Sequence, residues 1–149
     1  MSIMIVRGPE EASRLMRGPA PLPRELLHQL VARAADVGKT VALRACGSEQ
    51  ELLDALRVAQ QARIEVAVID PGACAGNPRL HRVLAALDYP YVEAHDDGSE
   101  RPEPPLPDGL GQRIASVHGY RAQSYTLALS IALEHLGCES APRDIHVGT

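Results

Sequence analysis

Glu93 and His95 are the residues of this chain whose types and spacing best suit acid–base chemistry. They stand two positions apart in the apolar segment Tyr91-Val-Glu-Ala-His95, which is typical of a strand. Because alternate residues of a strand share a face, the two side chains are expected together at the strand tip, with His95 facing solvent. Open parallel sheets bind ligands at that end of their strands. The pair predicts either a histidine acid or base tuned by a carboxylate, or a structural pair that fixes a loop.

More carboxylates are expected at the same edge of the sheet. The acidic residues that follow predicted strand ends are Glu10, Asp70, Asp96 and Asp97. Like charges within about 6 Å of one another oppose the binding of a further carboxylate. The edge is therefore predicted to suit a neutral or cationic ligand better than an anion, unless Arg14, Arg17 and Arg101 point inward.

The remaining histidines and the cysteines show no pattern of a metal site or a disulfide. The other histidines are His28, His81, His118, His135 and His146. Their spacing is not that of metal ligands. The three cysteines form no CxxC pair and are odd in number, which favours reduced thiols. We therefore expect no cofactor and no metal.

Five short apolar runs alternate with segments of helical periodicity, which indicates an α/β fold with a parallel sheet and right-handed crossovers. The predicted strands are residues 3–6, 41–45, 66–69, 91–94 and 114–117. The predicted helices are residues 26–37, 48–59, 77–87 and 123–136. Ser48 begins a capping-box pattern and Pro78 suits a first helical turn. The last helix is apolar on more than one side, which predicts a partner besides its own sheet.

Two long connections interrupt this alternation, residues 8–23 and 96–112, and each contains four prolines. Long loops in compact domains are usually functional or disordered. Since residues 8–23 leave the C-terminal end of the first strand, we expect a lid there. Residues 96–112 carry five acidic residues against one arginine, so they fit a solvated excursion as well as a substrate-contacting arm.

The composition excludes several classes of protein. With 149 residues, 45% of them apolar, the chain is long enough for one globular core. A formal charge of −4 without a basic run argues against binding to nucleic acid or to an anionic membrane surface. No run approaches the roughly 20 apolar residues needed to span a bilayer, and the first residues lack a signal-peptide pattern. We expect a cytoplasmic protein.

Four segments in chain order carry a resemblance to a known family. They are Arg7-Gly-Pro9, Asp70-Pro-Gly-Ala73, Glu93-Ala-His95 and Gly119-Tyr-Arg-Ala-Gln-Ser-Tyr-Thr-Leu-Ala-Leu129. From about residue 3 to residue 137 the chain resembles the type II 3-dehydroquinate dehydratases. The resemblance implies a flavodoxin-like three-layer sandwich with a five-stranded parallel sheet ordered 2-1-3-4-5. It also implies a mobile loop after the first strand and a homo-oligomer of trimers, assembled as a dodecamer.

The resemblance implies a mechanism as well. In the family, a loop tyrosinate whose pKa is lowered by a loop arginine removes a proton next to a ketone. An asparagine-held water helps to stabilise the enolate, and a histidine protonates the departing hydroxyl. Glu93 and His95 match the family's Glu-x-His pair, and Arg17 falls on the loop arginine. Leu22 stands where the family has its tyrosine.

Other positions depart from the family's pattern. Glu10 occupies the position of the first asparagine of the Gly-Pro-Asn-Leu-Asn motif. Asp70 replaces the asparagine of the Asn-Pro-Gly-Ala-Tyr motif, in which Gly72 is kept. The range 96–97, Asp-Asp, replaces an Ile-Ser pair whose amides hold the substrate carboxylate, and Arg101 matches one arginine of the following arm.

From these residues we expect an altered dehydroquinase-like enzyme, a lyase, isomerase or cyclase acting on a small oxygenated metabolite other than 3-dehydroquinate. The expected catalytic residues are His95, Glu93 and Arg17, and the expected substrate-binding residues are Glu10, Asp70, Gly72, Asp96, Asp97 and Arg101. Two alternatives stay open: a non-catalytic ligand-binding or structural homologue, and a genuine 3-dehydroquinate dehydratase with a substitute base. The domain is expected to span residues 1–137, with a tail over 138–149.

Overall fold

The computed structural model describes residues 2–96 and 104–138, and its centre is a five-stranded parallel sheet. The strands are β1 (Ile3–Arg7), β4 (Val41–Ala45), β5 (Val66–Asp70), β6 (Tyr91–Ala94) and β7 (Arg113–Val117). They lie in the order β4-β1-β5-β6-β7. Counted along the chain, these five strands have the order 2-1-3-4-5, so the predicted topology is confirmed.

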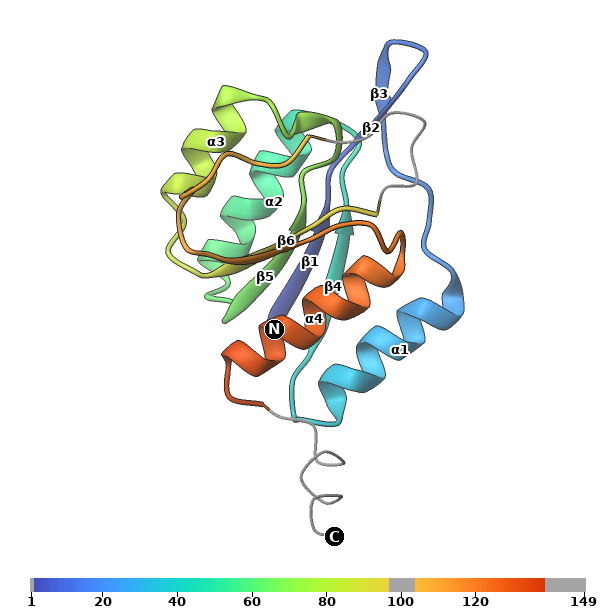
Figure 1. The fold of residues 1–149 in the computed structure, drawn as a ribbon, viewed down its shortest axis with the longest axis vertical. Coiled ribbons are helices and arrows are strands. Elements are labelled where there is room, and N and C mark those ends of the chain that lie inside the picture. Colours follow the sequence, from blue (N-terminus) through green and yellow to red (C-terminus); the bar gives the residue numbers. More distant parts are fainter. Residues whose placement is uncertain (1, 97–103, 139–149) are drawn as a thin grey trace, which may run out of the picture.

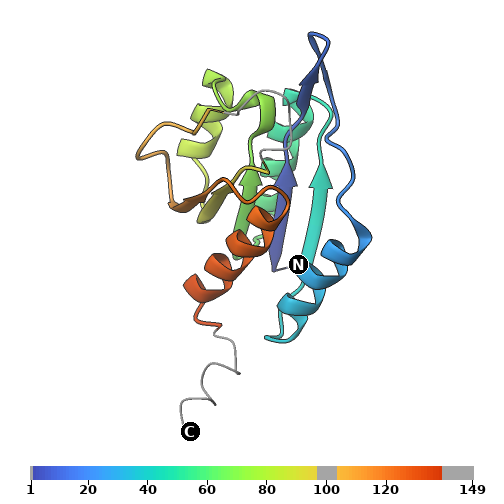
Figure 2. The ribbon, with the colours of Figure 1, turned by 45° about the vertical axis from the view of Figure 1, so that its right-hand side comes forward.

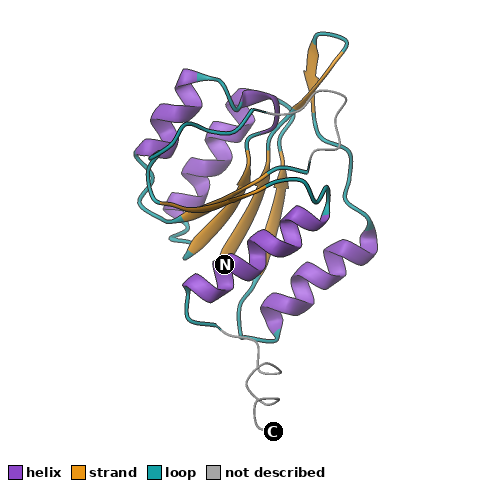
Figure 3. Cartoon of the chain, in the orientation of Figure 1, coloured by secondary structure: helices purple, strands orange, loops and turns teal. Residues whose placement is uncertain are grey.

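Helices cover both faces of the sheet (Figure 1). On one face lie α2 (Glu49–Gln61) and α3 (Pro78–Ala85), and on the other α1 (Arg24–Ala35) and α4 (Gln123–His135). A short 3-10 helix, η1 (Gly72–Cys74), follows β5. Figure 3 shows the resulting helix, sheet and helix layers. The α/β fold predicted from the alternation of elements and the flavodoxin-like sandwich implied by the resemblance are therefore confirmed.

Alternate residues of the central strands supply two separate cores. In β1, Met4 and Val6 pack with α2 and α3, whereas Ile3 and Ile5 pack with α1 and α4. All four side chains are buried. Strands covered on both faces need nearly continuous apolar sequence, which is why these strands could be recognised without alternation.

Local signals place the helix starts. Ser48 Oγ accepts a hydrogen bond from the Glu51 N–H at 3.2 Å, as the capping-box pattern predicted. Pro78 is the first residue of α3, where its missing N–H removes no helical hydrogen bond. None of the helices within residues 2–96 and 104–138 is long and apolar enough to cross a bilayer.

The connection after β1 contains a hairpin that the sequence did not predict. Strands β2 (Glu10–Ala12) and β3 (Leu15–Arg17) pair antiparallel and project beyond the sheet (Figures 1 and 2). The two turn residues, Ser13 and Arg14, both have positive φ. Such turns usually contain Asn-Gly or Asp-Gly, so Ser-Arg gave no recognisable signal.

The second long connection returns to the core. Of residues 96–112, the structure describes 96 and 104–112. Leu106 is buried against the α2 and α3 side, and Gly111 approaches the Leu84 carbonyl so closely that an added Cβ would meet that oxygen at 2.3 Å. The described part of this connection is thus anchored to the domain.

Candidate functional site

The Glu93 and His95 side chains are in direct contact. His95 Nε2 lies 2.5 Å from Glu93 Oε2, and neither side chain is exposed. Glu93 belongs to β6 and His95 follows that strand, so both project from the face covered by α2 and α3. The shared face follows from the two-residue spacing. The expectation that His95 faces solvent is wrong, because the His118 ring stacks on it with centroids 5.0 Å apart and planes 4° apart.

Glu93 accepts four hydrogen bonds. Its Oε2 accepts one hydrogen bond from His95 Nε2 and another, at 3.0 Å, from the Leu106 N–H. Its Oε1 receives Arg113 Nη1 and Ser116 Oγ, each at 2.9 Å. Burial alone would raise the pKa of Glu93, but the hydrogen bonds from His95, Leu106 and Ser116 outweigh it and lower the pKa to about 2. Glu93 is therefore a permanently charged acceptor that orients its neighbours.

Arg113, Ser116 and His118 were not among the residues proposed from sequence. Ser116 is opposite Glu93 in the register of β6 and β7, and the register shifts between Tyr91 and Val92. The register of parallel strands depends on the crossover between them, so it could not be read from the chain. The polar Ser116 among the otherwise apolar residues 114–117 was the available signal.

A second buried cluster lies on the opposite face of the sheet and is centred on Arg7. Arg7 and Asp70 are partners in the register of β1 and β5. The Arg7 guanidinium donates from Nε to Tyr125 Oη at 3.1 Å, from Nη1 to the Ala20 carbonyl at 2.8 Å and from Nη2 to Asp96 Oδ2 at 3.3 Å. Arg7 is only 3% exposed. The cluster joins the ends of three strands to α4 and to the segment after the hairpin.

Tyr125 completes this second cluster as a hydrogen-bond donor. Its hydroxyl donates to Asp70 Oδ2 at 2.5 Å. Burial, followed by the charge of Asp70, raises the pKa of Tyr125 well above its ordinary value. Burial also raises the pKa of Tyr89, and it raises that of Tyr91 to about 12. These three tyrosines are therefore poor sources of a tyrosinate base.

The carboxylates expected at this edge of the sheet have cationic or hydroxyl partners in the structure. Glu10 accepts from Arg17 Nε at 2.7 Å, Asp96 is paired with Arg7, and Asp70 accepts from Tyr125. Sequence reasoning overlooked Arg7 as the compensating cation, because a strand-end arginine could equally have faced solvent. Among the described residues, the Arg7 guanidinium lies beside the carboxylates of Asp70 and Asp96.

Gly72 ties two strand-end loops together. Its φ is +57°, and an added Cβ would lie 2.4 Å from the Pro9 carbonyl oxygen. Its N–H donates to Asp70 Oδ1 at 3.0 Å, and the Gly8 N–H donates to the Asp70 carbonyl at 2.7 Å. This contact needs a glycine at position 72 for reasons of backbone geometry.

The other proposed site residues are not brought to either cluster by a described contact. Arg17 has a side chain 66% exposed and pairs with Glu10 at the base of the hairpin. Asp97 and Arg101 lie outside the described residues. Arg17 is thus placed with Glu10 in the hairpin and away from the Glu93–His95 contact.

Cys46 and Cys74 are both buried. Burial raises the pKa of Cys46 and of Cys74 to about 11, so neither is a ready thiolate. Within residues 2–96 and 104–138, no three His, Cys, Asp or Glu side chains are grouped so as to hold a metal ion.

Comparison with known proteins identifies the fold. The chain matches the crystal structure of a type II dehydroquinase from Propionibacterium acnes with a TM-score of 0.66 and 22% identity, over 88% of this chain and 97% of that one. For a type II dehydroquinase from Butyrivibrio crossotus the TM-score is 0.67 at 15% identity, over 89% and 97% of the two chains. For a 3-dehydroquinate dehydratase-like protein from Bifidobacterium longum the TM-score is 0.58 at 17% identity, over 92% of this chain and 99% of that one.

No protein-family model matches the chain, and no curated protein matches it either. At 15–22% identity, the structural matches establish the fold of the type II dehydroquinases, as the sequence motifs predicted. The chemistry has to be argued from the residues of this chain.

Proposed function

We propose that this chain is an enzyme with a dehydroquinase-type fold and an altered active site. It acts as a lyase, isomerase or cyclase on a small oxygenated metabolite other than 3-dehydroquinate. His95 is the proton-transfer residue, and Glu93 is the positioning residue that orients it. The observation that carries the proposal is the 2.5 Å contact between His95 and a carboxylate that accepts three further hydrogen bonds.

This arrangement suits proton transfer for a physical reason. An ionised Glu93 stabilises the protonated imidazole of His95 and fixes the ring through Nε2. Since both oxygens of Glu93 are already occupied, His95 is the member of the pair suited to exchange a proton with a substrate. The short contact and the buried surroundings strengthen the electrostatic coupling between the two groups.

The rest of the site argues against 3-dehydroquinate itself. Residues 8–23 contain no tyrosine, and Leu22, at the position expected for one, is a buried apolar residue. Asp70 and Asp96 stand where the resembled family has neutral residues, and added carboxylates disfavour a carboxylate substrate. A neutral polyhydroxylated ketone fits these charges better.

Several further features belong to this proposal. We place Arg17 beside the catalytic residues when residues 8–23 close as a lid, within a domain over 1–137 followed by a tail over 138–149. The ligand-binding residues proposed here are Glu10, Asp70, Gly72, Asp96, Asp97 and Arg101. We also propose a cytoplasmic homo-oligomer built from trimers, as a dodecamer. Exposed Val31 on α1 and Leu127 on α4, at 53% and 40%, support association.

A direct enone absorbance assay with 3-dehydroquinate tests the altered chemistry. Without a positioned base, the rate should fall by about 10² to 10⁴ relative to the two type II dehydroquinases matched above. The substrate class is then sought by incubating the protein in D₂O with a panel of small cyclic hydroxyketones. Exchange of a proton next to the carbonyl in one of them would support the proposal. A full dehydroquinase rate would instead identify a genuine dehydratase with a substitute base.

One observation favours a second candidate, a non-catalytic homologue. Both Glu93 and His95 are 0% exposed, as expected for a pair that only fixes the end of β6. Under this alternative, replacing His95 lowers stability and leaves ligand affinity unchanged. Under the enzyme proposal, the same change abolishes exchange.

A further inference from the structure

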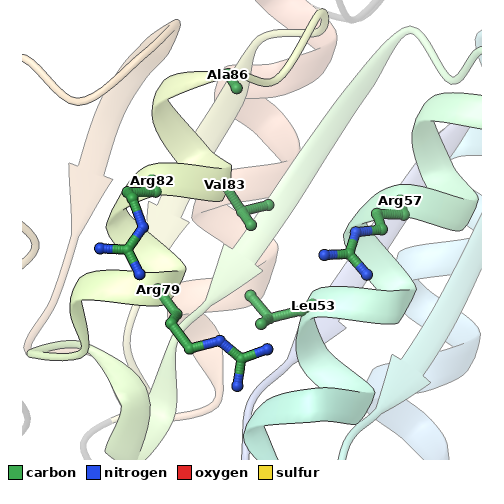
Figure 4. Close-up of a pocket in the computed structure, with 6 residues that line it drawn as sticks. All are labelled: Leu53, Arg57, Arg79, Arg82, Val83 and Ala86. Carbon is green, nitrogen blue, oxygen red and sulfur yellow. The ribbon is translucent and has the colours of Figure 1, made fainter.

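Outside both clusters, a hollow lies between α2 and α3. It has a volume of about 270 Å³ and is lined by Leu53, Arg57, Arg79, Arg82, Val83 and Ala86. We call these six residues the arginine groove. Figure 4 shows Arg57 and Arg79 extending from the two helices toward the space beside Leu53 and Val83. The groove thus has an apolar floor and a cationic rim.

The charges around the arginine groove do not cancel. Arg57 is paired with Asp54 at 3.6 Å, and Arg79 contacts Glu49 at 3.3 Å and Gln50 at 3.2 Å. Arg82 makes no hydrogen bond or ion pair within the described part of the chain. Three guanidinium groups against two carboxylates leave one net positive charge, although the whole chain carries −4.

The partners of Arg57 and Arg79 leave donors available for a ligand. A guanidinium presents five N–H donors in a planar fork, and these contacts use only part of them. The side chains of Arg57 and Arg79 are 59% and 54% exposed, so a ligand can reach them. Guanidinium forks match the oxygen pairs of phosphates and carboxylates.

We propose that the arginine groove binds a small organic oxyanion, a phosphate monoester or a carboxylate with an apolar body. The oxyanion contacts Arg82 and Arg79, and the apolar part lies on Leu53, Val83 and Ala86. The volume, slightly below that of typical ligand pockets, limits the apolar part to about one ring. This site is separate from the His95 cluster and does not depend on the function proposed above.

Phenyl phosphate is the probe that combines both features. The full-length protein, labelled at its Leu and Val methyl groups, is titrated and followed by NMR. Saturable shifts of the Leu53 and Val83 methyl resonances are expected. Inorganic phosphate, which lacks the ring, should bind more weakly, and phenol, which lacks the anion, should not compete. Benzoate in place of phenyl phosphate distinguishes a carboxylate site from a phosphate site.

Matched variants identify the contacts. Arg82→Gln and Arg79→Gln should each lower the affinity for phenyl phosphate by about tenfold, which is the effect of losing a charge-assisted hydrogen bond. Arg44→Gln, at an exposed position of β4, should bind like the wild type. Equal affinity in Arg82→Gln and Arg44→Gln, or shifts that never saturate, would overturn the proposal. A second outcome would also overturn the proposal: the wild type does not bind phenyl phosphate, and light scattering gives Arg82→Gln a different mass from the wild type. That result would show that another copy of the chain covers the groove.

Discussion

The guanidinium of Arg113 contacts Glu93 Oε1 at 2.9 Å, while His95 contacts the other oxygen of the same carboxylate. One buried carboxylate therefore joins the N-terminal end of β7 to the residue after β6. Because neither Glu93 nor His95 is exposed, the pair contributes to folding as well as to any chemistry. The two contributions can be measured separately.

Glu93→Gln should destabilise the protein by about 3 to 5 kcal/mol at neutral pH, since it removes one partner of a buried ion pair. Urea unfolding measures this change. The control is Glu65→Gln, which removes a partly exposed carboxylate bound to Lys39. It should leave the unfolding midpoint nearly unchanged.

The same carboxylate predicts a pH dependence. Its pKa is lowered to about 2 in the folded protein, below the ordinary value that applies to the unfolded chain. A lowered folded pKa adds stability above the unfolded pKa of about 4.3, and this stability is lost as the pH falls toward 2. The difference in unfolding free energy between wild type and Glu93→Gln should therefore shrink between about pH 5 and pH 2. A constant difference over this range would contradict the assignment.

Tyr125→Phe should cost about 1 to 3 kcal/mol, because the lost hydroxyl donates to the buried Asp70 and accepts from Arg7. The matched control is Tyr89→Phe. The Tyr89 hydroxyl is also buried but donates to the neutral Leu56 carbonyl, so its loss should cost less. Thermal unfolding of both variants checks the order, and a larger loss for Tyr89→Phe would show that the Arg7 cluster is not specially stabilising.

Gly72→Ala tests the close approach of the two strand-end loops. Its added Cβ would meet the Pro9 carbonyl oxygen at 2.4 Å, and its φ is +57°. Gly38→Ala is the control, since Gly38 also has positive φ, at +76°, but nothing lies within 4 Å of its Cβ position. Both should lose stability through backbone strain. Only Gly72→Ala should lose several kcal/mol more of unfolding free energy, because its Cβ clashes with the Pro9 carbonyl oxygen. Equal losses in denaturant unfolding would mean that the loops can separate.

Sequence predicted the sheet because its strands are buried on both sides and separated by amphipathic helices with recognisable starts at Ser48 and Pro78. It missed the hairpin at Ser13 and Arg14 because neither residue signals a type I′ turn. The spacing of Glu93 and His95 was enough to predict a shared face. Their burial was not predicted, since it depends on contacts from outside β6, such as the ring of His118, which follows β7.

The Arg7 cluster shows the same limit. Asp70 and Asp96 were recognised at strand ends, but their partners are far away in the sequence. Arg7 is 63 residues from Asp70 and 89 from Asp96, and Tyr125 is 55 residues from Asp70. Such contacts are fixed by strand register and by the packing of α4. Neither is visible in a single sequence.

His95 is proposed to transfer a proton to or from the substrate. The direct measurement is the rate of α-proton exchange in D₂O for His95→Ala, with the hydroxyketone that the wild type exchanges. His28→Ala, at an exposed position of α1, is the matched control for unspecific imidazole catalysis, and thermal unfolding shows whether each variant is folded. Folded His95→Ala should lose exchange by at least about 10²-fold while His28→Ala keeps it. Wild-type exchange by His95→Ala with a lowered unfolding midpoint, or no exchange of any panel compound by the wild type, would contradict this role of His95.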